Sequence, residues 1–173
     1  MDRSRRSVLR ASGVALAGGL AGCLGDVRSQ LAGGGGTDDE ELTLESLAVG
    51  GSPGGELAVN PSGEATLVDF FATWCQPCKP QMEGLGTVRE QYPDLAMRSI
   101  TNETDRDAVR DFWREYDGTW PVLIDPKAEA QQAYRPPGMP TLFVYDADGE
   151  EVWRHTGLAR TERIAEAVAT AQS

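Results

Sequence analysis

The feature that most constrains this chain is a cysteine pair, Cys75 and Cys78, placed directly after a strongly apolar run. That run, residues 65–71, contains only two polar side chains, which is typical of a buried central strand. Residues 77–91 follow with apolar side chains at helical spacing, although Pro80 and two glycines lower their helix propensity. The pair therefore lies where a buried strand passes into a helix.

A Cys-x-x-Cys pair at such a junction has a chemical use. The unpaired N–H groups and the dipole of a helix N-terminus favour the thiolate form of the first thiol, Cys75. The second thiol, Cys78, is about one helical turn away and can attack a mixed disulfide. Pro77 suits the first helical turn, where a missing N–H costs little. The spacing therefore favours a redox pair.

Two other uses of the pair stay open at this point. A zinc site would need a second pair of ligands, and the chain offers only His155 beyond the three cysteines and the carboxylates. A permanent structural disulfide between the pair would close a very short loop and remove little entropy from the unfolded chain. We assign no metal ligand.

Charge divides the 173 residues into two unlike parts. The formal net charge is −11, and residues 1–22 hold four Arg against one Asp, so the remainder carries −11 − 3 = −14. This remainder contains only two lysines, Lys79 and Lys127. Its acidity argues against a nucleic acid partner, because binding to a phosphate backbone needs clustered Lys and Arg side chains. High acidity with few lysines indicates a halophilic, salt-adapted protein, since about 1 M salt shortens the Debye length to ~3 Å.

The basic beginning of the chain is expected to be an export signal. Residues 1–22 place paired arginines before an uncharged run that is too short to cross a hydrocarbon core of about 30 Å, which resembles a twin-arginine signal. Leu20-Ala21-Gly22-Cys23 resembles a lipobox, so Cys23 is the expected lipidation site. The alternatives are a disordered basic terminus or a short surface helix for residues 1–22, and an incidental cysteine at Cys23.

The chain is therefore expected to have three parts. Residues 1–22 form the signal, and residues 23–41 form a lipid anchor and a Gly-rich, acidic linker. Residues 42–173 form one folded domain. These parts predict an exported protein on the outer face of the cytoplasmic membrane, held there by lipid at Cys23.

The folded part reads as alternating strands and helices of a mixed α/β domain. The expected strands are 42–44, 57–59, 65–71, 95–100, 122–124, 141–145 and 151–155. The expected helices are 77–91, 105–116 with Thr104 as its cap, 128–134 and 161–171. The segment 50–55 is expected to be a long turn between the first two strands, and Asp146 to Gly149 is expected to be a hairpin turn.

Four segments resemble one family. Residues 68–79 resemble the active-site segment of thioredoxins, and residues 138–144 resemble their cis-proline loop and the strand after it. Residues 120–126 and 148–157 look more like the TlpA/ResA-like extracytoplasmic thiol–disulfide oxidoreductases. The resemblance covers residues 42–173 and implies a thioredoxin-like fold with a central mixed sheet, flanking helices and an N-terminal β extension.

The resemblance also implies roles for individual residues. Cys75 would be the more exposed, attacking thiol, and Cys78 would be the buried thiol that resolves the mixed disulfide. Pro140 would be cis, which costs little before proline, and the backbone of Met139 would then pair with an extended substrate. Trp74, Gln76 and Pro77 complete the expected substrate-binding surface: Gln76 and Pro77 lie between the cysteines, and Trp74 would pack beside them, unless it is a plain core aromatic.

Asp69 is an acid in an otherwise apolar strand. A desolvated carboxyl there should have a raised pKa, and the resemblance implies that it accepts the proton of Cys78. The alternative is an aspartate at a strand edge that reaches solvent.

The expected activity is that of a thiol–disulfide oxidoreductase that reduces protein disulfides with no cofactor beyond the Cys75–Cys78 pair. Its electron donor at the membrane is not specified by any residue, and a narrower version is reduction of apocytochrome c before haem attachment. The Gln-Pro dipeptide lacks the His that oxidising relatives carry, which favours a reductant. A disulfide-introducing oxidant or isomerase, and a copper-handling protein of the same fold, are the alternatives.

Overall fold

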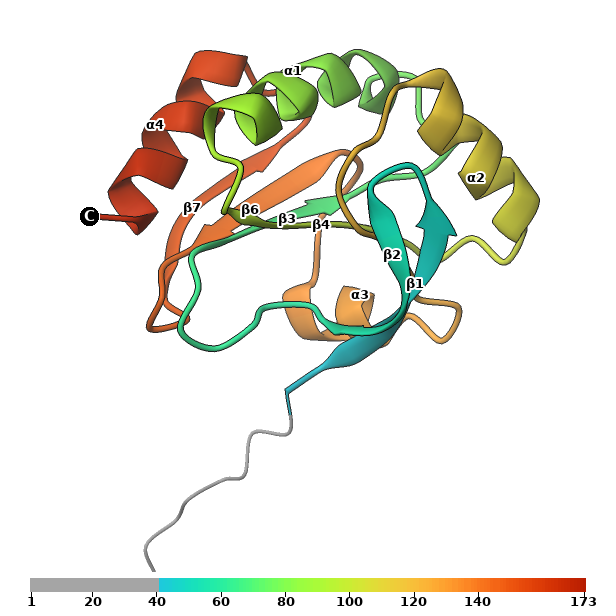
Figure 1. Cartoon of the computed structure of the whole chain (residues 1–173), viewed down its shortest axis with the longest axis horizontal. Helices are drawn as coiled ribbons and strands as arrows, with labels where there is room; N and C mark the ends of the chain where they lie inside the picture. The colour runs from blue at the N-terminus through green and yellow to red at the C-terminus, as the bar shows by residue number, and fades with distance from the viewer. Residues whose placement is uncertain (1–40) are drawn as a thin grey trace, which may run out of the picture. The chain divides into compact units, whose positions relative to one another are not determined.

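The computed structural model describes residues 41–173. The expected export signal, Cys23 and all but the last residue of the expected linker lie outside the described residues. Within the described part, the chain forms one seven-stranded mixed sheet with helices on both faces (Figure 1). The expected fold class is confirmed.

The strands and helices alternate along the chain much as the sequence predicts. The strands are β1 (Thr43–Val49), β2 (Ser52–Ala58), β3 (Thr66–Phe70), β4 (Ala96–Thr101), β5 (Val122–Ile124), β6 (Thr141–Tyr145) and β7 (Glu151–Thr156). The helices are α1 (Cys78–Gln91), α2 (Arg106–Glu115), α3 (Glu129–Tyr134) and α4 (Thr161–Ala171). In the sheet, the strand order is β2-β1-β5-β4-β3-β6-β7, with β5, β4 and β3 parallel and the other neighbours antiparallel.

The N-terminal hairpin differs from the expectation. The segment 50–55 is not a long turn, because β1 and β2 pair in register up to Val49 and Ser52 and leave only two residues between the strands. Those residues, Gly50 and Gly51, lie so close to the backbone of Gly118 and Thr119 that a Cβ would come within 2.3 and 2.0 Å of carbonyl oxygens. The glycines are therefore required by close packing at the tip of a hairpin.

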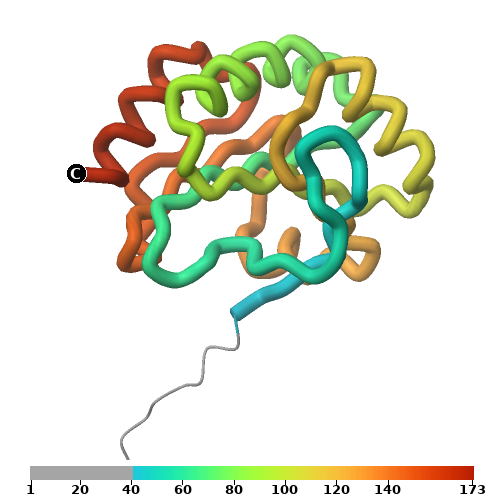
Figure 2. Tube along the Cα trace, viewed as in Figure 1, coloured from blue at the N-terminus to red at the C-terminus, as the bar shows by residue number. Residues whose placement is uncertain are grey.

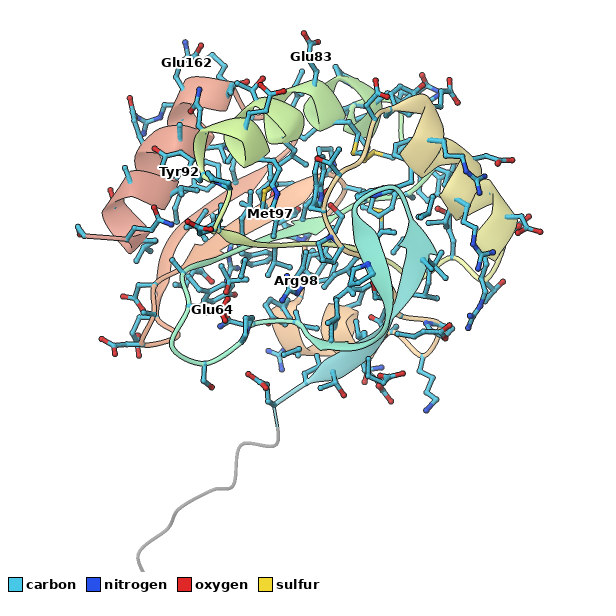
Figure 3. The ribbon with its side chains drawn as sticks, in the orientation of Figure 1. Glu64, Glu83, Tyr92, Met97, Arg98 and Glu162 are labelled. Atoms are coloured by element: carbon cyan, nitrogen blue, oxygen red, sulfur yellow. A yellow bond between two sulfur atoms is a disulfide. The ribbon has the colours of Figure 1, made fainter. Side chains whose placement is uncertain are left out.

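The sheet separates two apolar cores. The larger core lies between the sheet and helices α1, α2 and α4, and the smaller one lies on the face that carries α3 (Figure 1). Side chains alternate between these faces along each strand. In β4, Met97 belongs to the larger core, whereas Arg98 turns to the other side and donates a hydrogen bond to the carbonyl oxygen of Ala58 (Figure 3).

Helix α1 is continuous despite its weak propensity. It packs beside α4, the C-terminal helix, as the trace in Figure 2 shows. Gly84 makes this approach possible, since a Cβ at that position would lie 2.9 Å from the side-chain oxygen of Thr161 at the start of α4. Tertiary packing therefore compensates for the low helix propensity of this segment.

Of two predicted local features, the cap of α2 is wrong and the hairpin turn between β6 and β7 is confirmed. Thr104 is not the cap of α2; the carboxylate of Asp105 accepts hydrogen bonds from the N–H groups of Asp107 and Ala108 instead. The predicted hairpin turn between β6 and β7 is confirmed, with the carboxylate of Asp146 accepting two backbone hydrogen bonds and Gly149 at a positive φ of 82°.

Candidate active site

The two cysteines lie at the carboxyl end of the central strand. β3 ends at Phe70, and α1 begins at Cys78, so Cys75 lies in the turn before the helix and Pro77 takes the N-cap position. Cys75 and Cys78 are joined by a disulfide, with their Cα atoms 5.3 Å apart. Their side chains are 4% and 2% exposed, so the expected difference in exposure is small in this oxidised state.

A carboxylate fastens the loop that carries Cys75. Both oxygens of Glu103 accept hydrogen bonds from Thr73, one from its backbone N–H at 2.7 Å and one from its hydroxyl at 2.8 Å. The hydroxyl of Thr101, at the end of β4, donates a third bond to the same carboxylate at 3.2 Å. Glu103 therefore ties the turn two residues before Cys75 to the end of the neighbouring strand.

The peptide bond between Met139 and Pro140 is cis, as the resemblance implied. β6 starts at Thr141, which pairs with Phe70 at the end of β3. Because of that register, the Met139–Pro140 bond lies at the end of the sheet from which the Cys75 loop also departs. Met139 is half-buried and packs against the core that contains both cysteines.

The loop after β7 connects helix α1 to the cis-proline. The side-chain oxygen of Gln81, on α1, accepts a hydrogen bond from the N–H of Ala159 at 2.8 Å. Two residues earlier, the N–H of Gly157 donates to the carbonyl oxygen of Pro140 at 2.8 Å. One short loop therefore holds α1 and the cis-proline segment in a fixed relation.

Asp69 is fully enclosed. It is the last residue but one of β3 and lies on the same face as Leu67 and Phe71, and this is the face covered by α1 and its first residue, Cys78. The side chain is 3% exposed, so the alternative of an edge aspartate that reaches solvent is wrong. Burial raises its pKa to about 7 from the ordinary value of 3.8, and a hydrogen bond from Ser99 partly opposes this shift. The predicted direction is confirmed.

The other expected substrate-contacting residues lie around the pair. Trp74 is 69% exposed, so the alternative of a core aromatic is wrong and its indole is open to solvent. Gln76 and Pro77 are exposed between the cysteines. Exposed side chains of Trp74, Gln76 and Pro77 therefore surround the disulfide, while the two cysteines themselves are buried.

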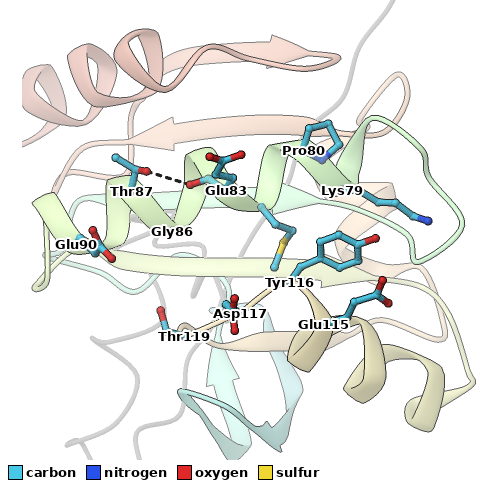
Figure 4. Close-up of a pocket in the computed structure, with 11 residues that line it drawn as sticks. Lys79, Pro80, Glu83, Gly86, Thr87, Glu90, Glu115, Tyr116, Asp117 and Thr119 are labelled. Carbon is cyan, nitrogen blue, oxygen red and sulfur yellow. Dashed lines mark hydrogen bonds between the residues drawn. The ribbon is translucent and has the colours of Figure 1, made fainter.

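An acidic groove of about 600 Å³ runs along α1 from Lys79 toward the end of α2 (Figure 4). Four carboxylate side chains border it, those of Glu83, Glu90, Glu115 and Asp117. Lys79 is the one base among its lining residues. Helix α1, which starts at Cys78, thus presents a negatively charged side to solvent.

Several residues that shape the site were not identified from the sequence. The local sequence pattern does not reveal them, because their hydrogen-bond partners are distant in the chain. Glu103 and Ser99 each bond a residue 30 positions away, and Gln81 bonds a residue 78 positions away. Within residues 41–173, no group of three or more His, Cys, Asp or Glu side chains is placed to hold a metal ion. In the same part of the chain, no helix is both long and apolar enough to span a membrane.

Comparison with known proteins gives consistent relatives. The chain is 29% identical over 106 residues to the thiol-disulfide oxidoreductase ResA of Bacillus thuringiensis, a match covering 60% of this chain and 61% of that protein. It is 25% identical over 118 residues to the sporulation thiol-disulfide oxidoreductase A of Bacillus subtilis, covering 65% of this chain and 72% of that one. The chain thus spans about three fifths of the length of the ResA relative.

Solved structures share the fold. The crystal structure of a secreted Mycobacterium tuberculosis disulfide oxidoreductase superposes with a TM-score of 0.66 at 22% identity, over 76% of this chain and 98% of that one. StoA from Bacillus subtilis superposes with a TM-score of 0.63 at 21% identity, over 73% and 94%. With the sequence relatives, these matches confirm the resemblance to the TlpA/ResA-like branch of the thioredoxin superfamily. A family profile described as Redoxin matches residues 56–171, more than half of the sequence and including both cysteines and the cis-proline, and the chain therefore belongs to the Redoxin family.

Proposed function

We propose that the chain is a thiol–disulfide oxidoreductase that reduces protein disulfides outside the cytoplasm. One observation carries this proposal: the Cys75–Cys78 disulfide lies at the start of α1, at the same end of the sheet as the cis Met139–Pro140 bond. A reactive pair beside a backbone segment that can receive an extended chain suits attack on a disulfide within a protein.

In the proposed cycle, the thiolate of Cys75 attacks one sulfur of the client disulfide. A mixed disulfide forms, and the first client sulfur leaves as a thiolate that takes a proton from solvent. Cys78 then gives its proton to the carboxylate of Asp69, and its thiolate attacks the sulfur of Cys75. The Cys75–Cys78 disulfide forms, and the second client sulfur leaves as a thiolate that also takes a proton from solvent, so the client gains two electrons and the protein loses two. An external dithiol donor is needed to restore the reduced pair.

Client binding is proposed for the surface around the disulfide. The backbone of Met139 would pair with an extended client segment, because β6 begins at Thr141 and its ladder does not include Met139. Exposed Trp74, Gln76 and Pro77 would contact the client side chains on the other side of the pair. These roles rest on exposure and position.

Trapping tests the order of the two thiols. In a Cys23→Ser background, which removes the third cysteine, Cys78→Ser should accumulate a mixed disulfide with oxidised insulin through Cys75. Cys75→Ser should accumulate none, and both variants should lose insulin-disulfide reduction. If Cys75→Ser instead forms the adduct or retains reduction, the assignment of the attacking thiol is wrong. The Cys23→Ser protein with the intact pair is the matched control.

The direction of electron flow is tested by the reduction potential of the pair. The Gln-Pro dipeptide supports a reductant, with an expected reduction potential of about −270 mV. A disulfide-introducing oxidant would have a reduction potential of about −120 mV. A narrower proposal is that the client is apocytochrome c. It predicts faster reduction of an oxidised Cys-x-x-Cys-His peptide than of the same peptide with Ala in place of His; equal rates would refute it.

The localisation of the protein is also part of the proposal. Residues 1–22 would direct export, Cys23 would carry lipid, and residues 23–41 would tether the domain 42–173 to the outer face of the cytoplasmic membrane. Membrane fractionation of the intact protein and of Cys23→Ala tests this address. Loss of the membrane-bound fraction in Cys23→Ala is expected, and unchanged fractionation would refute lipidation at this residue.

A further inference from the structure

A buried chain of hydrogen bonds ends on Asp69. The indole N–H of Trp120 donates to the hydroxyl oxygen of Ser99 at 2.9 Å, and that hydroxyl donates to Oδ2 of Asp69 at 3.0 Å. All three side chains are almost fully buried. Trp120 is itself fixed, because its ring packs edge-on against Trp113 with centroids 5.1 Å apart and its carbonyl oxygen accepts the indole N–H of Trp113.

The direction of these bonds follows from the groups. An indole N–H can only donate, so Ser99 must use a lone pair to accept it. The hydroxyl proton of Ser99 then remains available for Asp69. The two oxygens of Asp69 are therefore unequal: Oδ2 accepts the Ser99 hydroxyl, whereas Oδ1 is buried and has no hydrogen-bond partner among the described residues.

In the described part of the chain, no other charged group competes for this carboxyl. In the sheet, Asp69 pairs with Ser99 on β4 and with Leu142 on β6. The buried residues of α1, α2 and α4 on the same face include no acid and no base, and Cys78 is their one titratable side chain. The hydroxyl of Ser99 is thus the dominant polar contact of the carboxyl, and the protonation of Asp69 depends on how that hydroxyl points.

We propose that Ser99 and Trp120 are positioning residues for proton transfer: Trp120 holds the Ser99 hydroxyl on Oδ2 of Asp69, which leaves Oδ1 as the oxygen that takes the proton of Cys78. This inference rests on the proposed function. If Oδ2 received the proton, the Ser99 hydroxyl could no longer donate its own proton to that oxygen and would have to rotate. Trp120 already donates to the Ser99 oxygen, so it offers no acceptor for the rotated hydroxyl. With the proton on Oδ1, every existing bond in the chain is kept.

The test is a double-mutant cycle read by carboxyl ¹³C NMR titration of Asp69 in the disulfide form, in which neither Cys75 nor Cys78 titrates. Asp69→Asn identifies the resonance. Ser99→Ala should move the titration midpoint to higher pH by about 1 to 2 pH units, because it removes a hydrogen bond that stabilises the carboxylate. Trp120→Phe should move the midpoint in the same direction by less, because the Ser99 hydroxyl remains and loses only the hydrogen bond from the indole N–H that orients it.

The cycle separates positioning from packing. Adding Trp120→Phe to Ser99→Ala should cause no further movement of the midpoint, since Trp120 acts through the hydroxyl. An equal movement in both backgrounds, or an unmoved midpoint in Ser99→Ala, would overturn the inference. Ser46→Ala is the matched control, as Ser46 is also buried and hydrogen-bonded but lies on β1. If Ser99→Ala does not fold, Trp120→Phe alone still has to raise the midpoint.

A kinetic arm distinguishes this inference from the proposed function. Reduced Cys23→Ser protein is mixed with 5,5′-dithiobis(2-nitrobenzoate), and release of the second thionitrobenzoate reports attack by Cys78 on the mixed disulfide at Cys75. The acidic limb of its pH–rate profile should move with the NMR midpoint in Ser99→Ala. A moved midpoint with an unmoved limb overturns the proton route. Failure of the wild-type protein to reduce insulin would refute the proposed function, and the NMR arm would still test the hydrogen-bond chain.

Discussion

Both carboxylate oxygens of Glu103 accept hydrogen bonds from Thr73, at 2.7 Å from its N–H and 2.8 Å from its hydroxyl. The residues are 30 positions apart in the chain, and the contact fixes the turn that leads to Cys75. Hydrogen bonds to a charged group are the stronger class, and leaving a partly buried N–H unpaired adds a further cost.

Glu103→Ala should therefore loosen the Cys75 turn. We expect a loss of about 2 kcal/mol in the free energy of unfolding and a several-fold lower kcat/KM for insulin reduction, measured by urea unfolding and turbidity. Thr73→Val, which keeps the backbone bond, should show a smaller loss. Glu56→Ala removes an exposed carboxylate on β2 and serves as the control. Equal effects of the two glutamate variants would contradict the role of Glu103.

The buried carboxyl of Asp69 should make stability depend on pH. In the unfolded chain it ionises near its ordinary pKa of 3.8, whereas in the folded protein it stays protonated up to a pKa of about 7. The neutral carboxyl contributes fully to the free energy of unfolding below pH 3.8, and this contribution is lost as the pH rises from 3.8 to about 7. Above about pH 7 the carboxyl is ionised in both states, and the free energy of unfolding no longer changes because of it. The total loss is roughly 4 kcal/mol.

Asp69→Asn should abolish that part of the pH dependence. Asparagine is neutral throughout, so the difference in unfolding free energy between variant and wild type should grow in favour of the variant from about pH 4 to about pH 7. Urea unfolding of the disulfide form across this range measures it. Asp94→Asn changes an exposed carboxyl and should leave the slope unchanged. Parallel pH curves for wild type and Asp69→Asn would show that this carboxyl ionises normally.

Two glycines of α1 should respond in opposite ways to alanine. Gly86→Ala should raise stability by about 0.5 to 1 kcal/mol, because nothing lies within 4 Å of the added Cβ and alanine favours the helix. Gly84→Ala should lower it, because the added Cβ would lie 2.9 Å from the side-chain oxygen of Thr161.

The sign at Gly84 should reverse when that oxygen is removed. In a Thr161→Ala background, Gly84→Ala is expected to stabilise by about the same amount as Gly86→Ala. Thermal unfolding of the two single variants and the double variant provides the measurement. A destabilising Gly84→Ala in both backgrounds would mean that another contact sets the spacing of α1 and α4.

The acidity of the chain should appear as a salt requirement. We expect the thermal midpoint to fall when salt is lowered from about 1 M to about 0.1 M, because the Debye length grows from ~3 Å to ~10 Å and repulsion between carboxylates is less screened. Glu83→Gln combined with Glu90→Gln, which neutralises two carboxylates of the α1 groove, should reduce this fall. The charge-conserving pair Glu83→Asp and Glu90→Asp should not. A thermal midpoint independent of salt would refute salt adaptation.

Local patterns predicted most of the fold for identifiable reasons. The four helices and the five strands from β3 to β7 were expected close to their observed places, because apolar periodicity and turn residues are local properties, whereas β1 and β2 were predicted too short. The errors also have physical causes. The segment 50–55 looks like a loop by composition, yet backbone pairing with β1 starts β2 at Ser52 and leaves only Gly50 and Gly51 as the turn. Thr104 and Asp105 are both good caps, and only the helix start decides between them.

The sequence by itself determined the cysteine pair, its place between strand and helix, the segment around Pro140 and the buried acid at Asp69, since each depends on residue types close together in the chain. Only the tertiary structure decided what surrounds them: the Glu103 clamp on Thr73, the link from Gln81 to Ala159, and the Trp120–Ser99–Asp69 hydrogen bonds. These contacts join residues brought together by strand order and register. Distant pairings of that kind leave no local pattern, so they follow from the assembled sheet and not from any single segment.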